Sequence, residues 1–541
     1  MNNKNYILKS NNIFTAVNNE VISGAVAVKG NKITAVGKME EVIKLCDANT
    51  KIIDFGDRLI MPGFNDAHMH FSLGSIQNDP NFCLFLVDCK SEEECVERVA
   101  KFAKENPDNE WIYGWGWYSA VWDNPHTPSR KTLDALNLDR PICLSSFDLH
   151  SAWCNGAALE KAGITRNTPQ PVGASIGIDE NGELTGILEE LAATSPVTDM
   201  VLNVPTLKSS LLKCLANFRR LGITAIADVY PSGLTNKNIL DVIHEIETEN
   251  NLTSRVSLFP DLKEIDNAKK LKELYNSKKL RVAGLKLIID GVVESHTAYL
   301  SEPYKDAPTC CGKPSLTQEE LNNYVLAAER EGFAVKLHGI GDKAITMALD
   351  AYENAQKVAG AHKLHHSVEH IETIKAKDIA RMAGLNVLAC VQPQHVSGAI
   401  VSGAYNVYLG DERAAAAWPF REVLDSGAKL AFSTDLPAVY SLNPLWSIYG
   451  AVTRSEPDFG QPAEGFFREH AVTLSEALIA HTRDAAYAES FESEIGTLEP
   501  GKLADIIVLD CCLFDIDPMD IRYAQVDITM VDGIIVYERD R

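Results

Sequence analysis

Residues 58–70 read RLIMPGFNDAHMH, an apolar run that ends in His68-Met69-His70. Side chains alternate between the two faces of a β-strand, so two histidines separated by one residue point to the same side. Imidazole nitrogens on one side of a strand can hold one metal ion together. The run therefore predicts a buried strand that ends at a metal site.

Three further residues of metal-binding type stand at the ends of later apolar runs. His338 ends AVKLH, His370 ends SVEH and Asp435 ends LAFSTD. A single histidine at a strand end is more often a hydrogen-bonded structural group than a ligand, but here the residues occur as a set. The set predicts one metal centre that several strand ends build together.

Length and charge limit the class of protein. The chain has 541 residues, a formal net charge of -23 and 45% hydrophobic residues, which is typical of an acidic globular protein with two structural domains. Nucleic-acid binding calls for clustered Lys and Arg, so the acidic balance argues against it. The N-terminus has no apolar signal region and no apolar run approaches membrane length, so we expect a cytoplasmic protein without a membrane partner.

Both ends of the chain carry β-hairpin patterns. Residues 24–37 alternate around a Gly-Asn turn, residues 504–510 read as a strand, and residues 528–537 form a hairpin on an Asp-Gly turn. Each piece is too small to be stable alone. We therefore expect residues 1–58 and 488–541 to form one small composite β-sandwich.

The middle of the chain, residues 59–487, alternates strand patterns with helical ones such as 318–331 and 343–358. Eight strands are expected, at residues 59–70, 142–148, 223–229, 284–290, 333–338, 367–370, 386–392 and 429–435. Eight β-α repeats predict an α/β fold with a distorted (β/α)8 TIM barrel, in which functional groups lie at the C-terminal ends of the strands. Insertions are expected at about residues 71–141 and 151–220.

Seven motifs occur in one order along the chain: PGFxDxHxH at 62–70, Asp290-Gly291 with Thr297-Ala298, HGIGD at 338–342, Glu369-His370, QPxH at 392–395, TDxP at 434–437 and GxxEPGKxAD at 496–505. Together they resemble the amidohydrolase superfamily, specifically the amidohydrolase 3 or YtcJ-like group, which also contains N-substituted formamide deformylases. The resemblance spans about residues 24–537. It implies a metal-dependent hydrolase with a distorted barrel and a composite sandwich.

The chemistry implied by this resemblance needs an activated water. A divalent ion can lower the pKa of water to about 7 and polarise a carbonyl, and imidazoles with a carboxylate suit zinc. We expect Zn²⁺, as two ions or as one. His68, His70 and Asp435 would hold the more buried ion, and His338 and His370 the second. Asp435 would also be the catalytic general base and acid.

Lys286 lies within an apolar run, where an unpaired ammonium is costly. By similarity to two-metal amidohydrolases, it is expected to be carboxylated and to bridge both ions. The alternatives are a lysine paired with a carboxylate such as Asp290 or Asp228, or a bridge supplied by Glu190.

Four residues are candidates for substrate binding. His150 and His395 follow predicted strands and could bind a substrate oxygen, whereas Trp115 and Trp117 belong to an aromatic cluster at residues 111–118. Aromatic residues at this density also commonly form the small core of an insertion. Both interpretations of the two tryptophans remain open.

The leading hypothesis is a hydrolase of non-peptide carbon-nitrogen bonds (EC 3.5 type), acting on an N-acyl or N-formyl amide through a metal-activated hydroxide. One alternative is a one-metal deaminase of the same superfamily; another is a non-catalytic barrel scaffold. We expect a small-molecule substrate, and the sequence leaves open a homodimer. It does not specify the substrate or the metal.

Overall fold

The computed structural model describes residues 5–45, 47–119, 122–147, 151–171, 174–202, 207–229, 237–360, 364–396, 403–439, 441–458 and 460–540. The chain divides into two compact units. Unit 1 comprises residues 1–70, 215–231 and 247–541, and unit 2 comprises residues 71–214 and 232–246. Across the described ranges, every helix is too short or too polar to cross a membrane.

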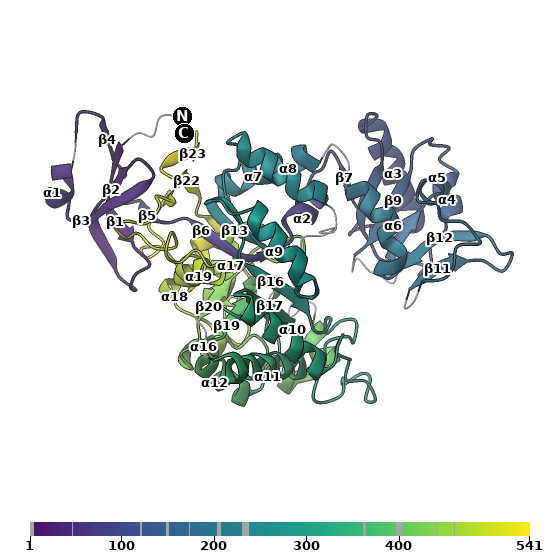
Figure 1. Cartoon of the computed structure of the whole chain (residues 1–541). Helices are drawn as coiled ribbons and strands as arrows, with labels where there is room; N and C mark the ends of the chain where they lie inside the picture. The colour runs from purple at the N-terminus through teal and green to yellow at the C-terminus, as the bar shows by residue number, and fades with distance from the viewer. Residues whose placement is uncertain are drawn as a thin grey trace. The chain divides into compact units, whose positions relative to one another are not determined.

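Strands from both ends of the chain join in one sheet of unit 1 (Figure 1, purple and yellow). Its strands are β1 Asn5–Phe14, β2 Val21–Lys29, β3 Lys32–Gly37, β4 Thr50–Asp54, β5 Leu59–Pro62, β21 Ile506–Leu509, β22 Val526–Val531 and β23 Ile534–Glu538. The order is β23-β22-β21-β5-β1-β2-β3, with β4 beside β1. The predicted turns are present, because Gly30 and Asp532-Gly533 have positive φ. Leu8, Val26, Ile506 and Met530 pack in a shared core, so the two ends stabilise each other.

In the described part of unit 1, nine parallel strands form the rest of the β-structure, in two sheets. One has the order β15-β14-β13-β6 and the other β16-β17-β18-β19-β20. Their bounds are β6 Phe64–Met69, β13 Ile223–Val229, β14 Arg255–Phe259, β15 Leu280–Val282, β16 Gly284–Ile288, β17 Ala334–Gly339, β18 Ser367–His370, β19 Leu388–Val391 and β20 Leu430–Phe432. Most residues of these strands are buried on both faces, as is typical of parallel sheets.

Backbone hydrogen bonds connect the two parallel sheets on both sides. Lys286 N–H donates to Pro260 O at 2.7 Å, next to β14. Asp435 N–H donates to His68 O at 2.8 Å, and His70 N–H donates to Leu436 O at 2.8 Å. These bonds hold the C-terminal end of β6 beside the segment that follows β20.

The helices of unit 1 are α1 Met39–Val42, α9 Ile265–Leu274, α10 Gln318–Arg330, α11 Asp342–Ala359, α12 Ala376–Leu385, α14 Ala404–Tyr408, α15 Asp411–Ala415, α16 Phe420–Asp425, α17 Pro444–Thr453, α18 Leu474–Ala480 and α19 Arg483–Ala488, with 3-10 turns η1 Ile43–Leu45, η3 Leu262–Glu264, η4 Arg468–His470 and η5 Pro518–Tyr523. The helices predicted at 318–331 and 343–358 are confirmed as α10 and α11. Thr317 and Glu320 form a capping box that fixes the start of α10.

Unit 2 has its own six-stranded sheet with the order β11-β12-β10-β9-β8-β7. The strands are β7 Cys83–Phe85, β8 Ile112–Trp117, β9 Ile142–Ser146, β10 Ser151–Cys154, β11 Ser175–Ile178 and β12 Leu184–Glu189. Its helices are α2 Phe71–Gln77, α3 Glu92–Glu105, α4 Arg130–Asp134, α5 Gly156–Lys161 and α6 Leu191–Leu202. α7 Leu207–Leu221 and α8 Lys237–Thr248 each have residues in both units.

The α/β class is confirmed, but two strand predictions are wrong. The strand predicted at 142–148 is β9, which pairs with β8 and β10 in the sheet of unit 2. That strand was expected between those at 59–70 and 223–229, but β6 and β13 pair directly, and β14, which was not predicted, follows β13 in the sheet. The two predicted insertions and the strand between them thus belong to one compact unit.

The strand predicted at 59–70 is two strands, β5 and β6, which belong to different sheets. The break falls at Gly63, where a Cβ would lie only 2.1 Å from Thr224 Oγ1. The close approach of Thr224 therefore requires glycine at the point where the chain leaves one sheet for the next.

Candidate metal centre

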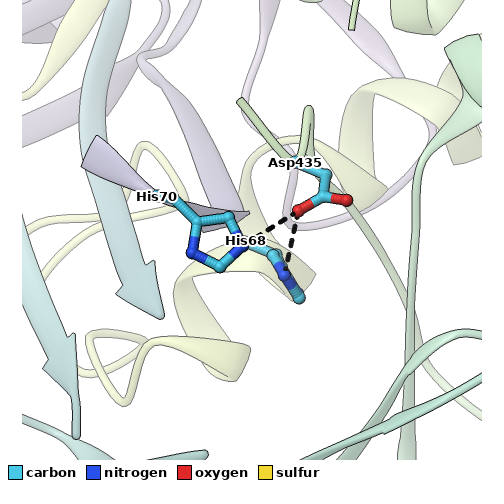
Figure 2. A group of neighbouring side chains, drawn as sticks. All are labelled: His68, His70 and Asp435. Carbon is cyan, nitrogen blue, oxygen red and sulfur yellow. Dashed lines mark ion pairs between the residues drawn. The ribbon is translucent and has the colours of Figure 1, made fainter. Parts of the chain in front are cut away.

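His68, His70 and Asp435 meet at the C-terminal end of β6 (Figure 2). Asp435 Oδ1 lies 3.2 Å from His68 Nε2 and 3.5 Å from His70 Nε2. Strand alternation puts both imidazoles on one side, as the HxH pattern predicted. Asp435 has a positive φ of 61°, a conformation costly for a residue other than glycine and common at functional sites.

The charge state of Asp435 suits a ligand. Burial by itself raises the pKa of this carboxyl, but the charge and hydrogen bonds of His68 and His70 outweigh burial and hold the pKa well below its usual range. Asp435 is therefore a carboxylate at neutral pH and can take part in binding a cation.

Asp66 holds His68 and Asp435 in place through hydrogen bonds to their strand segments. Its Oδ1 accepts from the backbone N–H of Thr434 at 3.1 Å and of His68 at 3.3 Å, and its Oδ2 accepts from Thr434 Oγ1 at 2.7 Å. The strand carrying His68 is thus tied to the segment carrying Asp435.

His338 and His370 lie beside this group, with ring centroids 4.2 Å apart. The His370 ring is also 4.9 Å from that of His68. His370 Nδ1–H donates to Gln392 Oε1 at 2.9 Å, and this bond leaves Nε2 as the nitrogen with a free lone pair. Burial lowers the pKa of His338 to about 3, with a further contribution from Lys286, so its imidazole is neutral. A neutral imidazole is the form that binds metal.

Among the described residues, His338 Nε2 is buried without a hydrogen-bond partner. Asp290 Oδ1 lies 3.9 Å from this nitrogen. Asp290 is used elsewhere, since its oxygens accept from the N–H groups of Tyr299, Ile340 and Gly341. The unpartnered nitrogen is therefore available to a ligand.

Lys286, on β16, is buried, and no hydrogen-bond partner for Nζ occurs within the described ranges. Burial lowers the pKa of Lys286 to about 8, against the opposing effect of Glu369 and Asp435. Neither Asp290 nor Asp228 forms an ion pair with it in the part of the chain that the structure describes. An unpaired buried amine is costly, so this position favours a partner or a modification.

Two groups behind His68, Glu369 and Lys336, have contacts that were not predicted from the sequence. His68 Nδ1–H donates to Glu369 Oε2, and Lys336 Nζ forms an ion pair with Glu369 Oε1 at 3.6 Å. The Glu369-His370 motif was visible, but regular strand alternation would put neighbouring residues on opposite faces. The φ of 76° at His370 breaks this alternation and lets both residues serve the site.

The candidate substrate-binding residues are distributed over both units. His395 is in unit 1, where its Nε2–H donates to Ala438 O at 2.9 Å and its ring stacks 6.5 Å from that of His370. His150 lies outside the described residues.

Trp115 and Trp117 are on β8 of unit 2. Trp117 belongs to the core of that unit and donates to Leu144 O at 2.7 Å. Trp115 stacks on Phe147 with ring centroids 5.8 Å apart. Glu190 is also in unit 2. The substrate and bridging roles of these residues stay predictions.

The donor set fits a divalent metal. The ligand atoms of His68, His70 and Asp435 lie within 4.8 Å of one another, and so do those of His370, His395 and Asp435. Nitrogen donors with one carboxylate are typical of zinc and related ions.

Family comparisons agree with this chemistry. The amidohydrolase family matches residues 51–537, and the allantoinase composite domain matches residues 1–58. The putative amidohydrolase YtcJ of Bacillus subtilis is 27% identical over 97% of this chain and 98% of its own length. The N-substituted formamide deformylase of Arthrobacter pascens is 27% identical over 95% of each chain. Protein LONG AFTER FAR-RED 3 of Arabidopsis thaliana is 29% identical over 98% of this chain and 91% of its own.

Two solved structures are similar over almost the whole chain. An uncharacterized metal-dependent hydrolase from Pyrococcus furiosus has a TM-score of 0.74 at 27% identity, covering 95% of this chain and all of that one. A second, from Pyrococcus horikoshii, has a TM-score of 0.77 at 25% identity, covering 95% and 98%.

Proposed function

Because the chain belongs to the amidohydrolase family, we propose that it is a zinc-dependent hydrolase of non-peptide carbon-nitrogen bonds, acting on an N-acyl or N-formyl amide. The observation that carries the proposal is the convergence of His68, His70 and Asp435 at one strand end. The relative named as an N-substituted formamide deformylase supports the amide class.

We propose that His68, His70 and Asp435 hold one ion, that His338 and His370 hold a second, and that a carboxylated Lys286 bridges them. The buried Lys286 Nζ and His338 Nε2, both without a hydrogen-bond partner in the described part of the chain, support this assignment. We also propose that the two parallel sheets form one distorted barrel, supported by the hydrogen bonds that connect them on both sides.

A bound divalent ion would supply a water of lowered pKa and polarise the substrate carbonyl. The protein itself would move the proton. Asp435 Oδ1 faces the two histidines, whereas Oδ2 lies 4.0 Å from His370 Nδ1. Oδ2 is thus the oxygen that would accept the proton of the attacking water and return it to the leaving nitrogen, so that the amide yields a carboxylic acid and an amine.

The test is metal content per chain, measured by mass spectrometry on protein prepared with Zn²⁺ and bicarbonate. We expect two ions in the wild type and loss of both in Lys286→Ala. Lys279→Ala is the matched control, because Lys279 donates to Leu252 O in the same unit and outside the site, and it should keep both ions.

Release of acid and amine from a panel of N-formyl and N-acyl amides completes the test. One ion that survives Lys286→Ala, together with ammonia release from amino-heterocycles, would favour the one-metal deaminase. A chain that takes up no ion after zinc reconstitution would contradict both enzymes and favour the scaffold.

A further inference from the structure

His366 and His68 are buried histidines of unit 1 that each contact a carboxylate, but in different ways. His366 Nε2–H donates to Glu329 Oε2 at 2.6 Å, and its Nδ1 accepts from Val335 N–H at 3.0 Å. Both nitrogens of His366 are engaged by the protein, so this ring has no lone pair for a ligand. His366 is therefore a buried structural group.

His68 has the opposite arrangement. Its Nδ1 is engaged by Glu369, while its Nε2 faces Asp435 Oδ1 at 3.2 Å. A carboxylate accepts only, so Nδ1 carries a proton, and in the neutral form of the ring that binds metal the lone pair lies on Nε2. The ring is held in the tautomer and orientation that a metal ligand needs.

The carboxylate behind His68 has its own counter-ion. Glu369 and Lys336 are both fully buried, with Nζ and Oε1 3.6 Å apart, and Ser367 Oγ–H donates to the same Oε1. Lys336 also lies over the Phe259 ring at 4.9 Å. A buried carboxylate without such a partner would be strongly destabilising, so Lys336 is what allows a full negative charge at this depth.

His370, in contrast to His68, is supported by a neutral group. The group behind its Nδ1 is the Gln392 amide, and Gln392 Nε2–H in turn donates to Ser433 Oγ at 2.9 Å. A neutral amide fixes the tautomer as a carboxylate does, but it adds no charge to the ligand. The two imidazoles therefore differ in the charge of their supporting group.

Resting on the metal-dependent function proposed above, we propose that Glu369, supported by Lys336, is a positioning residue for His68. It orients His68 Nε2 towards the metal and increases the affinity of the site formed by His68, His70 and Asp435 for its ion. Glu369 touches neither the substrate nor the ion; it acts through His68.

The experiment measures the affinity of metal-free protein for Zn²⁺ by competition with a chromophoric chelator. Glu369→Gln keeps an acceptor for Nδ1–H and removes the charge, and we expect about 10- to 100-fold weaker binding of the tighter ion. Glu329→Gln removes the carboxylate behind His366 and is the matched control, for which we expect wild-type affinity.

Glu369→Gln alone leaves Lys336 buried without its counter-ion and can fail to fold. The double variant Glu369→Gln/Lys336→Met removes both charges and avoids this problem. Circular dichroism checks its fold, and the visible absorption of the Co²⁺-loaded protein reports a changed ligand field that a loss of stability alone would not produce.

A folded double variant with wild-type Zn²⁺ affinity and an unchanged Co²⁺ spectrum would overturn the role of Glu369 while leaving the metal centre intact. Absence of Zn²⁺ binding in the wild type would instead overturn the proposed function, and the role of Glu369 with it.

Discussion

The interiors of the two units are built from different chemistry. In unit 1, Lys286, Lys336 and Glu369 are buried around β16 to β18. In unit 2, the core holds Trp117 and Trp153 together with aliphatic side chains. Buried charges are costly without partners, whereas buried rings need only close packing. Buried charged side chains thus lie beside the candidate metal residues of unit 1, whereas the core around Trp117 and Trp153 in unit 2 is held by packing.

The strand sequences alone do not reveal this difference. β9, with the sequence ICLSS, is an apolar run that ends in polar residues, like the strands of the candidate site, but it lies in unit 2. β14 begins with a charged residue, Arg255, and yet it occupies a central place among the parallel strands. The apolar character of a strand predicts that it is buried, but it does not predict which sheet the strand joins.

The largest effect that would sharpen this comparison is expected from Asp435→Asn. The variant loses the proposed metal ligand and the proposed proton carrier together, so we expect hydrolysis to fall about 10⁴-fold. The measurement is kcat on the amide hydrolysed by the wild type, at saturating Zn²⁺, with thermal unfolding as the check on folding. Activity within a few-fold of wild type would remove Asp435 from the mechanism.

In unit 2, Trp153→Ala tests how much the aromatic core contributes to stability. Trp153 is fully buried, and its Nε1 has no partner among the described residues, so its contribution is packing. We expect the free energy of unfolding of unit 2 to fall by about 3 to 5 kcal/mol because a cavity remains. Limited proteolysis and urea unfolding measure this, and the zinc content of the folded protein should not change. Loss of zinc at unchanged stability would contradict the division of roles.

The smallest effect is expected from Tyr352→Phe, in unit 1. The Tyr352 hydroxyl lies 2.9 Å from Val335 O and 2.8 Å from Ser367 O, at the starts of β17 and β18. Removing one buried hydroxyl should cost about 1 kcal/mol. Urea unfolding detects it, and metal affinity should stay at the wild-type value, because the contact lies at the strand ends opposite to those of His338 and His370. A large loss of metal affinity would show that this contact also positions the site.

Much of the candidate site could be predicted because its signal is local. The HxH spacing at 68–70 and the polar residues that end buried strands depend only on strand alternation, and the structure brings His68, His70, His338, His370 and Asp435 together. The terminal hairpins were likewise readable from their turns at Gly30 and Asp532-Gly533. Such patterns arise from short-range geometry, so they can be recognised in the sequence without knowing the fold.

The missed features depend on partners far along the chain. β14 was not predicted from the sequence. A buried strand tolerates its Arg255 only because Asp505, 250 residues later, neutralises it, with Nε 2.7 Å from Oδ2. Glu369 was left without a role because its partners, Lys336 and His68, lie on other strands. Gly63 reads as part of one strand until Thr224 is seen against it.

The sequence by itself determined the family, the α/β class, the joining of both chain ends and the set of candidate metal-binding side chains, because each follows from local periodicity or from motifs kept in order. Only the tertiary structure decided which strands pair in which sheet, that residues 71–214 belong to a separate unit, and which histidine is supported by a carboxylate. Sheet pairing and buried charge compensation are set by contacts between residues that lie on different strands, from 33 positions apart for Lys336 and Glu369 to 301 for His68 and Glu369, and local patterning does not encode them.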